Sequence, residues 1–234
     1  MKAIQSVFDF GGRPQHTLEQ FVPGANALGL SLVRRMVEPS GEAQLYLWGE
    51  PGCGKTHLLH GACQHMSTLG LPAAYLSLAD ALHPGALDGL EQLALVTLDD
   101  IQAVVGQDAW ELALFDLINR LREQQVPLLL AADVPPVMLQ VRLPDLASRL
   151  AWGTVVHLEV LSDAGKREVL RAQAFERGME LSDEVIDFMF AHLPRGLDAL
   201  LNGLDALDRA SMTQQRKVTL PLLREVVRRI AVSR

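Results

Sequence analysis

The stretch GEPGCGKT, residues 49–56, constrains the fold of this chain more than any other. It fits the pattern G-x-x-x-x-G-K-[ST] and lies between a predicted strand and a predicted helix, a context that argues against an ordinary glycine-rich turn. There the glycines let backbone N–H groups close around phosphate oxygens, and the helix N-terminus adds positive potential. Lys55 can neutralise the outer phosphates, and the Thr56 hydroxyl can ligate Mg²⁺. The predicted nucleotide-binding residues of this loop are Gly49, Glu50, Pro51, Gly52, Cys53, Gly54, Lys55, Thr56 and His57.

Three aspartates that follow predicted strands form the second part of this candidate site. Asp99 and Asp100 end the apolar run LALVTLDD, and Asp133 ends LLLAAD. Open parallel sheets bind ligands at the carboxyl ends of their strands, so we expect Asp99 to hold Mg²⁺ together with Thr56. Asp100 can orient or deprotonate a water, and Asp133 can sense the γ-phosphate. The alternatives are solvated loop carboxylates for Asp99 and Asp100 and a helix N-cap for Asp133.

Short apolar runs alternate with amphipathic runs through the first 160 residues. Apolar runs bounded by breakers or charges are typical of strands that are buried on both faces. Their alternation with helices predicts an α/β domain with a mainly parallel five-stranded sheet. The expected strands are 44–48, 72–78, 93–100, 126–133 and 153–160, and the expected helices are 26–37, 55–69 and 108–124.

The pattern changes after Leu161. No strand pattern is clear there, and Ser162 and Ser182 can each cap a helix. A third helix is expected over about 197–210, and a fourth runs from Thr219 and Pro221 to the C-terminus. We therefore expect three parts: a flexible tail over 1–16, an α/β nucleotide-binding domain over 17–160 and a small all-helical domain over 161–234.

Composition narrows the class of protein and its partners. The net charge is −7, and the acidic excess lies in the first 160 residues, which argues against a large nucleic-acid surface. Two cysteines form no disulfide framework, so a reducing, cytoplasmic setting is expected. The apolar runs are too short to span a bilayer, and we expect no membrane partner.

The order of these motifs resembles the DnaA-related AAA+ family of ATPases. The phosphate loop, TLDDIQ, AAD, SRLAWG and a helical lid follow one another as in that family, over residues 17 to about 232. The segment LEQFVPGANALGL resembles the family's entry segment, whose residues line the adenine pocket. The resemblance therefore implies adenine contacts from Phe21, Val22 and Asn26.

The resemblance also implies a regulatory role. We expect this chain to lack the initiator's DNA-binding domain and its N-terminal oligomerisation domain, and so to make no sequence-specific DNA contact. Regulatory relatives bind ADP or ATP with Mg²⁺, dock on the DNA-loaded sliding clamp and stimulate hydrolysis of ATP bound to the initiator DnaA, which represses re-initiation. A nucleotide-dependent homo-oligomer is compatible with this role. Two alternatives stay open: a self-contained ATPase of the helicase-loader type, and a binding adaptor with structural ADP.

Arg149, in SRLAWG, falls on the arginine-finger position of the family. An arginine finger offers its cation to phosphate charge in the transition state, here in trans to a partner's ATP. Without the resemblance, Arg149 reads as a surface arginine that caps a helix or pairs with Asp145.

The tail contains QSVFDF, which resembles a peptide that binds sliding clamps. Gln5 comes first, Phe8 fourth and Phe10 sixth, and the two aromatics can act as anchors in a partner's pocket. Ser6 stands where such peptides usually have leucine. The alternative is that Phe8 and Phe10 fold back onto the chain's own core.

The lid departs from the family at one position. The helix that normally offers an arginine to the nucleotide has Asp198 there, and an aspartate repels phosphate. Arg195, almost one turn earlier, is the candidate replacement.

Overall fold

The computed structural model of the chain describes residues 16–38, 41–214 and 219–232. The tail residues Gln5, Phe8 and Phe10 lie outside these ranges. The chain divides into two compact units, Met1–Val160 and Leu161–Arg234. Within the described ranges, no helix is both long enough and apolar enough to cross a membrane.

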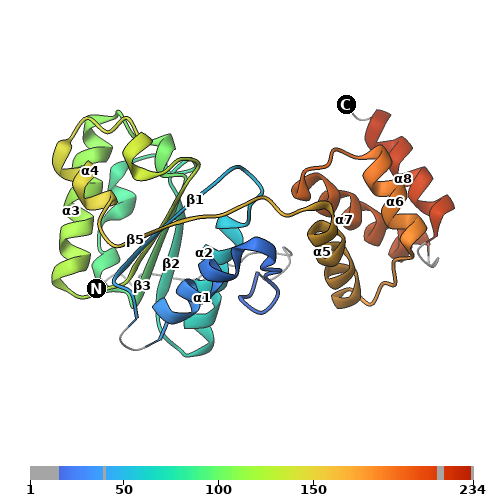
Figure 1. Cartoon of the computed structure of the whole chain (residues 1–234), viewed down its shortest axis with the longest axis horizontal. Coiled ribbons are helices and arrows are strands. Elements are labelled where there is room, and N and C mark those ends of the chain that lie inside the picture. Colours follow the sequence, from blue (N-terminus) through green and yellow to red (C-terminus); the bar gives the residue numbers. More distant parts are fainter. Residues whose placement is uncertain (1–15, 39–40, 215–218, 233–234) are drawn as a thin grey trace. The chain divides into compact units, whose positions relative to one another are not determined.

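A five-stranded parallel sheet forms the centre of the first unit (Figure 1). The strands lie in the order β2-β3-β4-β1-β5, so β1, which leads into the phosphate loop, is flanked by β4 and β5. This sheet confirms the predicted fold class. The strands are β1 (Gln44–Trp48), β2 (Ala73–Ser77), β3 (Leu95–Asp99), β4 (Leu128–Ala132) and β5 (Thr154–His157).

Helices cover both faces of this sheet, and alternating side chains supply the two apolar layers between them. Leu45 and Leu47 of β1 point to one face, towards α1 and α2, whereas Tyr46 points to the other, towards α3 and α4. The three inner strands β1, β3 and β4 are buried on both faces, and their sequences are continuous apolar runs for that reason. The helices are α1 (Ala27–Met36), α2 (Lys55–Thr68), α3 (Asp108–Glu123) and α4 (Pro144–Leu150).

A buried carboxylate ties α3 to the start of α4. Glu111 of α3 is 1% exposed and accepts hydrogen bonds from the backbone N–H groups of Gly106 (2.7 Å), Arg142 (3.0 Å) and Leu143 (2.8 Å). Burial raises the pKa of Glu111, but these backbone donors outweigh it, so the pKa lies below its usual value. Because Leu143 directly precedes α4, the carboxylate fixes where this helix begins.

Replacing Glu111 by glutamine is expected to lower the free energy of unfolding by about 1–3 kcal/mol at pH 7, because an amide NH₂ would face backbone donors. The folded pKa is depressed, so this contribution is present above the unfolded value of about 4.3 and is lost as pH falls through the folded value. Urea unfolding at several pH values measures it. Glu123→Gln, at the exposed end of the same helix, is the control. Equal effects of the two variants would contradict the role of Glu111.

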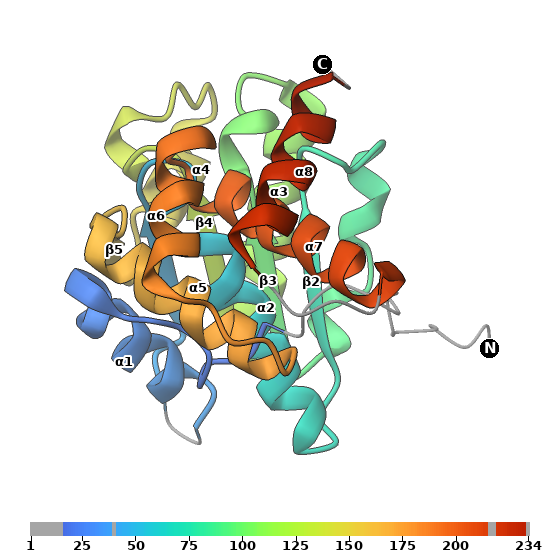
Figure 2. The same ribbon diagram turned by 90° about the vertical axis from the view of Figure 1, so that its right-hand side faces the viewer.

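All the regular secondary structure in the described residues of the second unit is helical, as Figure 2 shows in orange and red. Its core is apolar, and Leu200, Leu204 and Leu207 lie at helical spacing on one buried face of α7. Ser162 and Ser182 cap α5 and α6 through the N–H groups of Gly165 and Val185. The helices are α5 (Asp163–Glu176), α6 (Asp183–His192), α7 (Leu197–Gln214) and α8 (Leu220–Val232).

Candidate nucleotide-binding site

The phosphate loop joins β1 to α2 and has the backbone that its glycines allow. Gly52 and Gly54 have φ values of 81° and 100°, in the left-handed region that side chains disfavour. A Cβ on Gly54 would also lie 2.7 Å from the ring of Phe21. Gly54 directly precedes α2, so the loop ends at a helix N-terminus, where free N–H groups favour anions. The predicted strand–loop–helix arrangement is therefore present.

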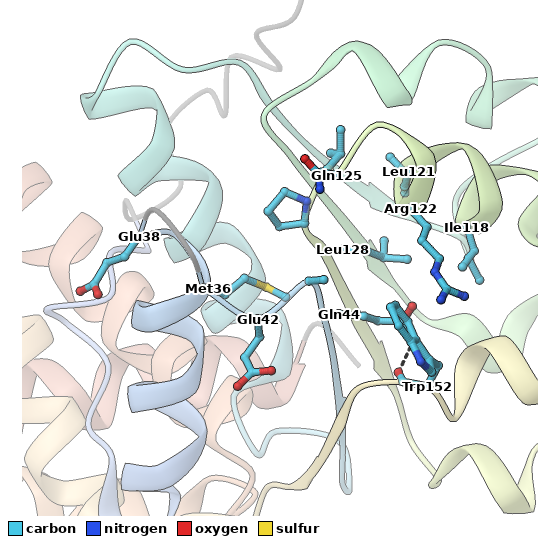
Figure 3. Close-up of a pocket in the computed structure, with 14 residues that line it drawn as sticks. Met36, Glu38, Glu42, Gln44, Ile118, Leu121, Arg122, Gln125, Leu128 and Trp152 are labelled. Atoms are coloured by element: carbon cyan, nitrogen blue, oxygen red, sulfur yellow. Dashed lines mark hydrogen bonds between the residues drawn. The ribbon is translucent and has the colours of Figure 1, made fainter.

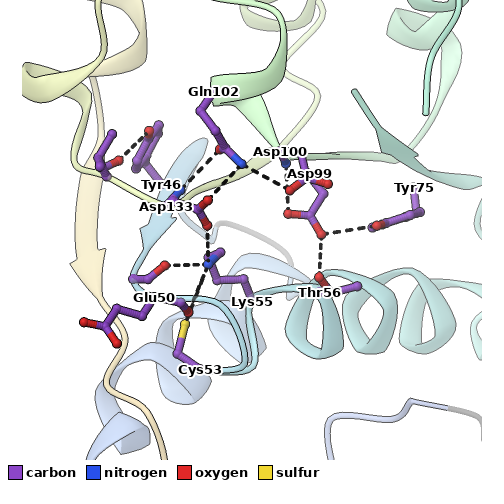
Figure 4. Close-up of polar contacts among 12 residues, drawn as sticks. Tyr46, Glu50, Cys53, Lys55, Thr56, Tyr75, Asp99, Asp100, Gln102 and Asp133 are labelled. Carbon is purple, nitrogen blue, oxygen red and sulfur yellow. Dashed lines mark hydrogen bonds and ion pairs between the residues drawn. The ribbon is translucent and has the colours of Figure 1, made fainter. Parts of the chain in front are cut away.

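Lys55 lies at the start of α2, and its ammonium is held within the loop. The side chain is 8% exposed, and Nζ donates to the carbonyl oxygens of Gly49 (2.5 Å) and Glu50 (3.3 Å). It also forms a 3.1 Å ion pair with Asp133, which follows β4 (Figure 4). Because β4 neighbours β1, the sheet order brings these two residues together across 78 positions of sequence. Asp133 thus pairs with the phosphate-loop lysine; the cap of the short helix Pro136–Met138 is Pro135.

Thr56 and Asp99 form an oxygen-only pair next to the lysine. Thr56 Oγ1 donates to Asp99 Oδ2 at 2.7 Å, and Asp99, the last residue of β3, is 2% exposed. Burial raises the pKa of Asp99, and hydrogen bonds from Thr56, the Asp100 N–H and Tyr75 act against that rise. Hydroxyl and carboxylate oxygens are the ligands that Mg²⁺ takes beside phosphates. The residues present therefore fit a Mg²⁺ ion.

Asp100 and Asp133 are joined by Gln102. The Gln102 amide nitrogen lies 3.2 Å from Asp100 Oδ1 and 3.3 Å from Asp133 Oδ2, and its oxygen accepts from the Asp133 N–H at 3.2 Å. Asp100 has φ of 58°, unusual for a residue other than glycine, and also accepts from Ser77 of β2 at 3.0 Å. The two carboxylates are thus held by Ser77 of β2 and by Gln102 of the segment after β3, and Figure 4 shows the contacts of Gln102.

The entry segment lies against the loop and the first turn of α2. Phe21 is buried, contacts Gly54 and meets the His57 ring edge-on at 5.4 Å. The buried amide of Asn26 is paired with the backbone of Glu159, donating to its oxygen and accepting from its N–H, both at 2.8 Å. Val22 is half-buried. Of the three predicted adenine-pocket residues, Phe21 therefore borders the loop, whereas the Asn26 amide is paired with the backbone after β5. Adenine contacts from these residues stay a prediction.

His57 points to the entry segment. Its Nε2 lies 2.8 Å from the Thr17 carbonyl oxygen, and burial lowers its pKa to about 4. The imidazole is then neutral at pH 7, and Nε2 carries the proton because a carbonyl only accepts. His57 therefore fixes α2 to residue 17.

Arg149 lies at the opposite end of β1 from the phosphate loop. The Gln44 side-chain amide, at the start of β1, donates to the backbone oxygens of Arg149 (2.8 Å) and Trp152 (2.7 Å). The strand runs from Gln44 to Trp48 before the loop begins, about 13 Å at 3.3 Å per residue. Arg149 also packs on the α3 face of the sheet, whereas α2 covers the other. Its own phosphate loop is therefore out of its reach.

Two residues of α3 hold the Arg149 side chain. Nε donates to Asn119 Oδ1 at 3.0 Å, and the guanidinium carbon lies 5.9 Å from the centre of the Phe115 ring. No ion pair joins Arg149 to Asp145 within the described part of the chain. Because the hydrogen bond to Asn119 uses Nε, the two terminal nitrogens are not needed to fix the side chain. A guanidinium can offer that pair to two oxygens of a phosphate.

A cavity of about 660 Å³ opens at the same end of the sheet (Figure 3). Its lining includes Gln44, Leu121, Leu128 and Trp152, and the Arg122 guanidinium lies 4.2 Å over the Trp152 ring. The phosphate loop contributes none of the lining residues. The cavity therefore belongs to the Arg149 side of the unit and is separate from the candidate nucleotide site.

Arg195 lies in the second unit, before α7. Its side chain is 72% exposed and forms a 3.5 Å ion pair with Asp163, while its carbonyl accepts from Lys166 at 2.9 Å. Asp198, in the first turn of α7, is exposed. A nucleotide contact from Arg195 stays a prediction.

Sequence reasoning missed several polar residues of these two sites. Gln102 stands within the motif TLDDIQ but was given no role, although its position just after two site aspartates was a usable signal. Tyr75 donates to Asp99 at 3.2 Å from a neighbouring strand, and Asn119 reaches Arg149 across 30 positions. Nothing in the local pattern points to those two, because their partners are brought to them only by the fold.

Comparison with known proteins shows which families and structures this chain is similar to. The family model described as "Hda, lid domain" matches residues 163–227. Domain III of the replication initiation protein DnaA of Thermotoga maritima is 23% identical over 92% of this chain and 97% of that one, with a TM-score of 0.76. AMPPCP-bound DnaA of Aquifex aeolicus is 26% identical over 83% of this chain and 65% of that one (TM-score 0.70). The RuvB Holliday junction branch migration motor of Thermotoga maritima shares the fold at 20% identity, 92% and 72% coverage and a TM-score of 0.65.

The fold and the phosphate loop are those of an AAA+ protein, and the 26% identity to Aquifex aeolicus DnaA together with the lid match supports a DnaA-related one. Its second unit matches the lid of Hda over residues 163–227, so this unit is Hda-like. The family resemblance read from the motifs and the predicted helical lid are thereby confirmed.

Proposed function

We propose that this chain is a regulator of replication initiation that stimulates hydrolysis of ATP bound to DnaA by offering Arg149 in trans. The position of Arg149 is the observation that carries the proposal. It is fixed by Asn119 and anchored through its backbone at the end of β1 remote from its own phosphate loop. A cation held in this way can act on a phosphate only if a partner presents one.

The chain's own site would hold ADP or ATP. The N-terminus of α2, Lys55 and the Thr56–Asp99 pair suit phosphates with Mg²⁺, and DnaA, with the same fold, has been described bound to AMPPCP. When bound, Mg²⁺ would neutralise phosphate charge. Phe21, which lies against Gly54, and its neighbour Val22 would cover the base. The nucleotide would then stabilise the unit that presents Arg149.

Docking on the DNA-loaded sliding clamp belongs to the same proposal. QSVFDF, with Gln5, Phe8 and Phe10, supplies the peptide that would bind the clamp. Binding to the clamp would concentrate the regulator where initiation has already occurred, and this gives the repression of re-initiation its timing.

A single-round hydrolysis assay tests the proposal. DnaA loaded with labelled ATP is mixed with clamp, DNA and this protein, and ADP formation is followed. We expect stimulation with all components present and little when the clamp is omitted or when Gln5, Phe8 and Phe10 are all replaced by alanine. Stimulation that is the same without the clamp would remove the docking step, and no stimulation at all would remove the regulatory role.

A self-contained ATPase of the helicase-loader type is the second candidate. It is favoured by the set of Lys55, Thr56, Asp99 and Asp100, which is chemically sufficient for hydrolysis in cis. Turnover of ATP by the purified chain, without DnaA or clamp, at a rate equal to that of the complete mixture would favour this candidate over the regulator.

A further inference from the structure

The buried carboxylate of Asp99 is held by donors on both of its oxygens. Oδ1 accepts from the Asp100 N–H at 3.0 Å, and Oδ2 accepts from Thr56 Oγ1 at 2.7 Å and from the Tyr75 hydroxyl at 3.2 Å (Figure 4). Thr56 comes from α2 and Tyr75 from β2, so Oδ2 is held from two elements. The carboxylate cannot turn about its last torsion without losing one of these hydrogen bonds.

Tyr75 is itself fixed in the sheet and against α2. It pairs in register with Thr97 of β3, two residues before Asp99, and so points to the same face as that aspartate. Its ring stacks on the His60 ring of α2 at 3.8 Å between centroids. A ring that is restrained by its strand and by a stacked neighbour brings its hydroxyl to one place.

We propose that Tyr75 is a positioning residue for the Mg²⁺ ion: it fixes the orientation of Asp99 and thereby sets the Mg²⁺ dependence of nucleotide binding. The inference rests on the nucleotide site of the proposed function. Residues that hydrogen-bond a metal ligand fix its direction, and their removal typically weakens metal binding by about 10- to 100-fold. Tyr75 touches neither phosphate nor ion in this role. Its effect passes through Asp99.

The test measures the binding of AMPPCP, an analogue that is not hydrolysed, by calorimetry at increasing Mg²⁺ and in EDTA. For Tyr75→Phe we expect the Mg²⁺ concentration at half-maximal tightening to rise about tenfold or more. Affinity in EDTA should stay within about twofold of wild type, because only the metal-dependent part is lost. A purely structural role for the hydroxyl would lower thermal stability and leave the Mg²⁺ dependence unchanged.

Tyr46→Phe is the matched control. Tyr46 lies on β1 of the same sheet, is fully buried, and donates its hydroxyl to the Val134 carbonyl at 3.0 Å on the α3 side. The Tyr46→Phe variant also loses a hydroxyl and one hydrogen bond. The Mg²⁺ dependence of its AMPPCP binding should equal that of wild type. Tyr75→Leu, which also removes the ring stacked on His60, should shift the dependence at least as far as Tyr75→Phe.

Two negative results are distinguishable. If wild type binds AMPPCP more tightly with Mg²⁺ and Tyr75→Phe follows the same curve, the role of Tyr75 is refuted and the nucleotide site stands. If wild type shows no Mg²⁺ dependence, the Thr56–Asp99 metal site falls and the inference falls with it.

Discussion

Replacing Arg149 by alanine is expected to reduce the stimulated hydrolysis of DnaA-bound ATP by about a thousandfold, the lower end of the range for arginine fingers supplied in trans. The reason is electrostatic: negative charge on the transferred phosphoryl oxygens increases in the transition state, and a positioned guanidinium stabilises it. Binding of ADP by the variant should be unchanged, since Arg149 lies at the other end of β1 from the phosphate loop. The measurement is the single-round rate at saturating regulator.

Three further variants distinguish the loss of an arginine finger from a general loss of positive charge or of folded structure. Arg122→Ala removes another cation of the same surface, one stacked on Trp152, and should keep most of the stimulation. Arg149→Lys keeps the charge but loses the planar fork, and should recover only a small part of the rate. Asn119→Ala leaves the guanidinium but frees Nε, so an intermediate loss of about tenfold is expected. Wild-type stimulation by Arg149→Ala would show that the finger assignment is wrong.

Local pattern was sufficient for the elements of this fold but not for their arrangement. Strand β1 and the starts of α2 and α3 lie at the residues predicted from the spacing of apolar residues and from the glycines and prolines that end each run. The order β2-β3-β4-β1-β5 depends on contacts between distant segments, and no local signal encodes it. Helix α7 was expected to end near Ala210 but continues to Gln214. In this last turn the Thr213 hydroxyl donates to the Arg209 carbonyl, four residues earlier.

The site divides in the same way. Strand ends predicted the placement of Asp99, Asp100 and Asp133, since parallel strands bring their carboxyl ends to one edge. Their partners could not be predicted: the ion pair of Lys55 with Asp133 requires β4 to lie beside β1. Which strands lie side by side depends on the whole sheet. The sequence therefore predicts the residues that perform the chemistry of a site better than the residues that hold them in place.

Lys55→Met is expected to weaken ADP binding by about 100-fold, the effect of losing a desolvated charge partner worth roughly 3 kcal/mol. Lys55 is the buried cation of the loop, and an arriving phosphate would have to displace Asp133 from it. Binding is read from ligand-induced stabilisation. At an ADP concentration of about 100 times the wild-type Kd, the ligand stabilises wild type by about 2.7 kcal/mol and the variant by about 0.4 kcal/mol.

The carboxylate of this ion pair, Asp133, adds a second test of the Lys55 prediction. In Lys55→Met the Asp133 carboxylate stays near the phosphates without its cation, so part of the lost affinity is repulsion rather than missing attraction. Adding Asp133→Asn to Lys55→Met should therefore recover some ADP binding, whereas Asp133→Asn alone should change it less than Lys55→Met does. Arg120→Met, which breaks an ion pair with Glu91 in the same unit, should leave the ADP-induced stabilisation at its wild-type value. An unchanged response to ADP in Lys55→Met would mean that the loop at residues 49–56 is not where the nucleotide binds.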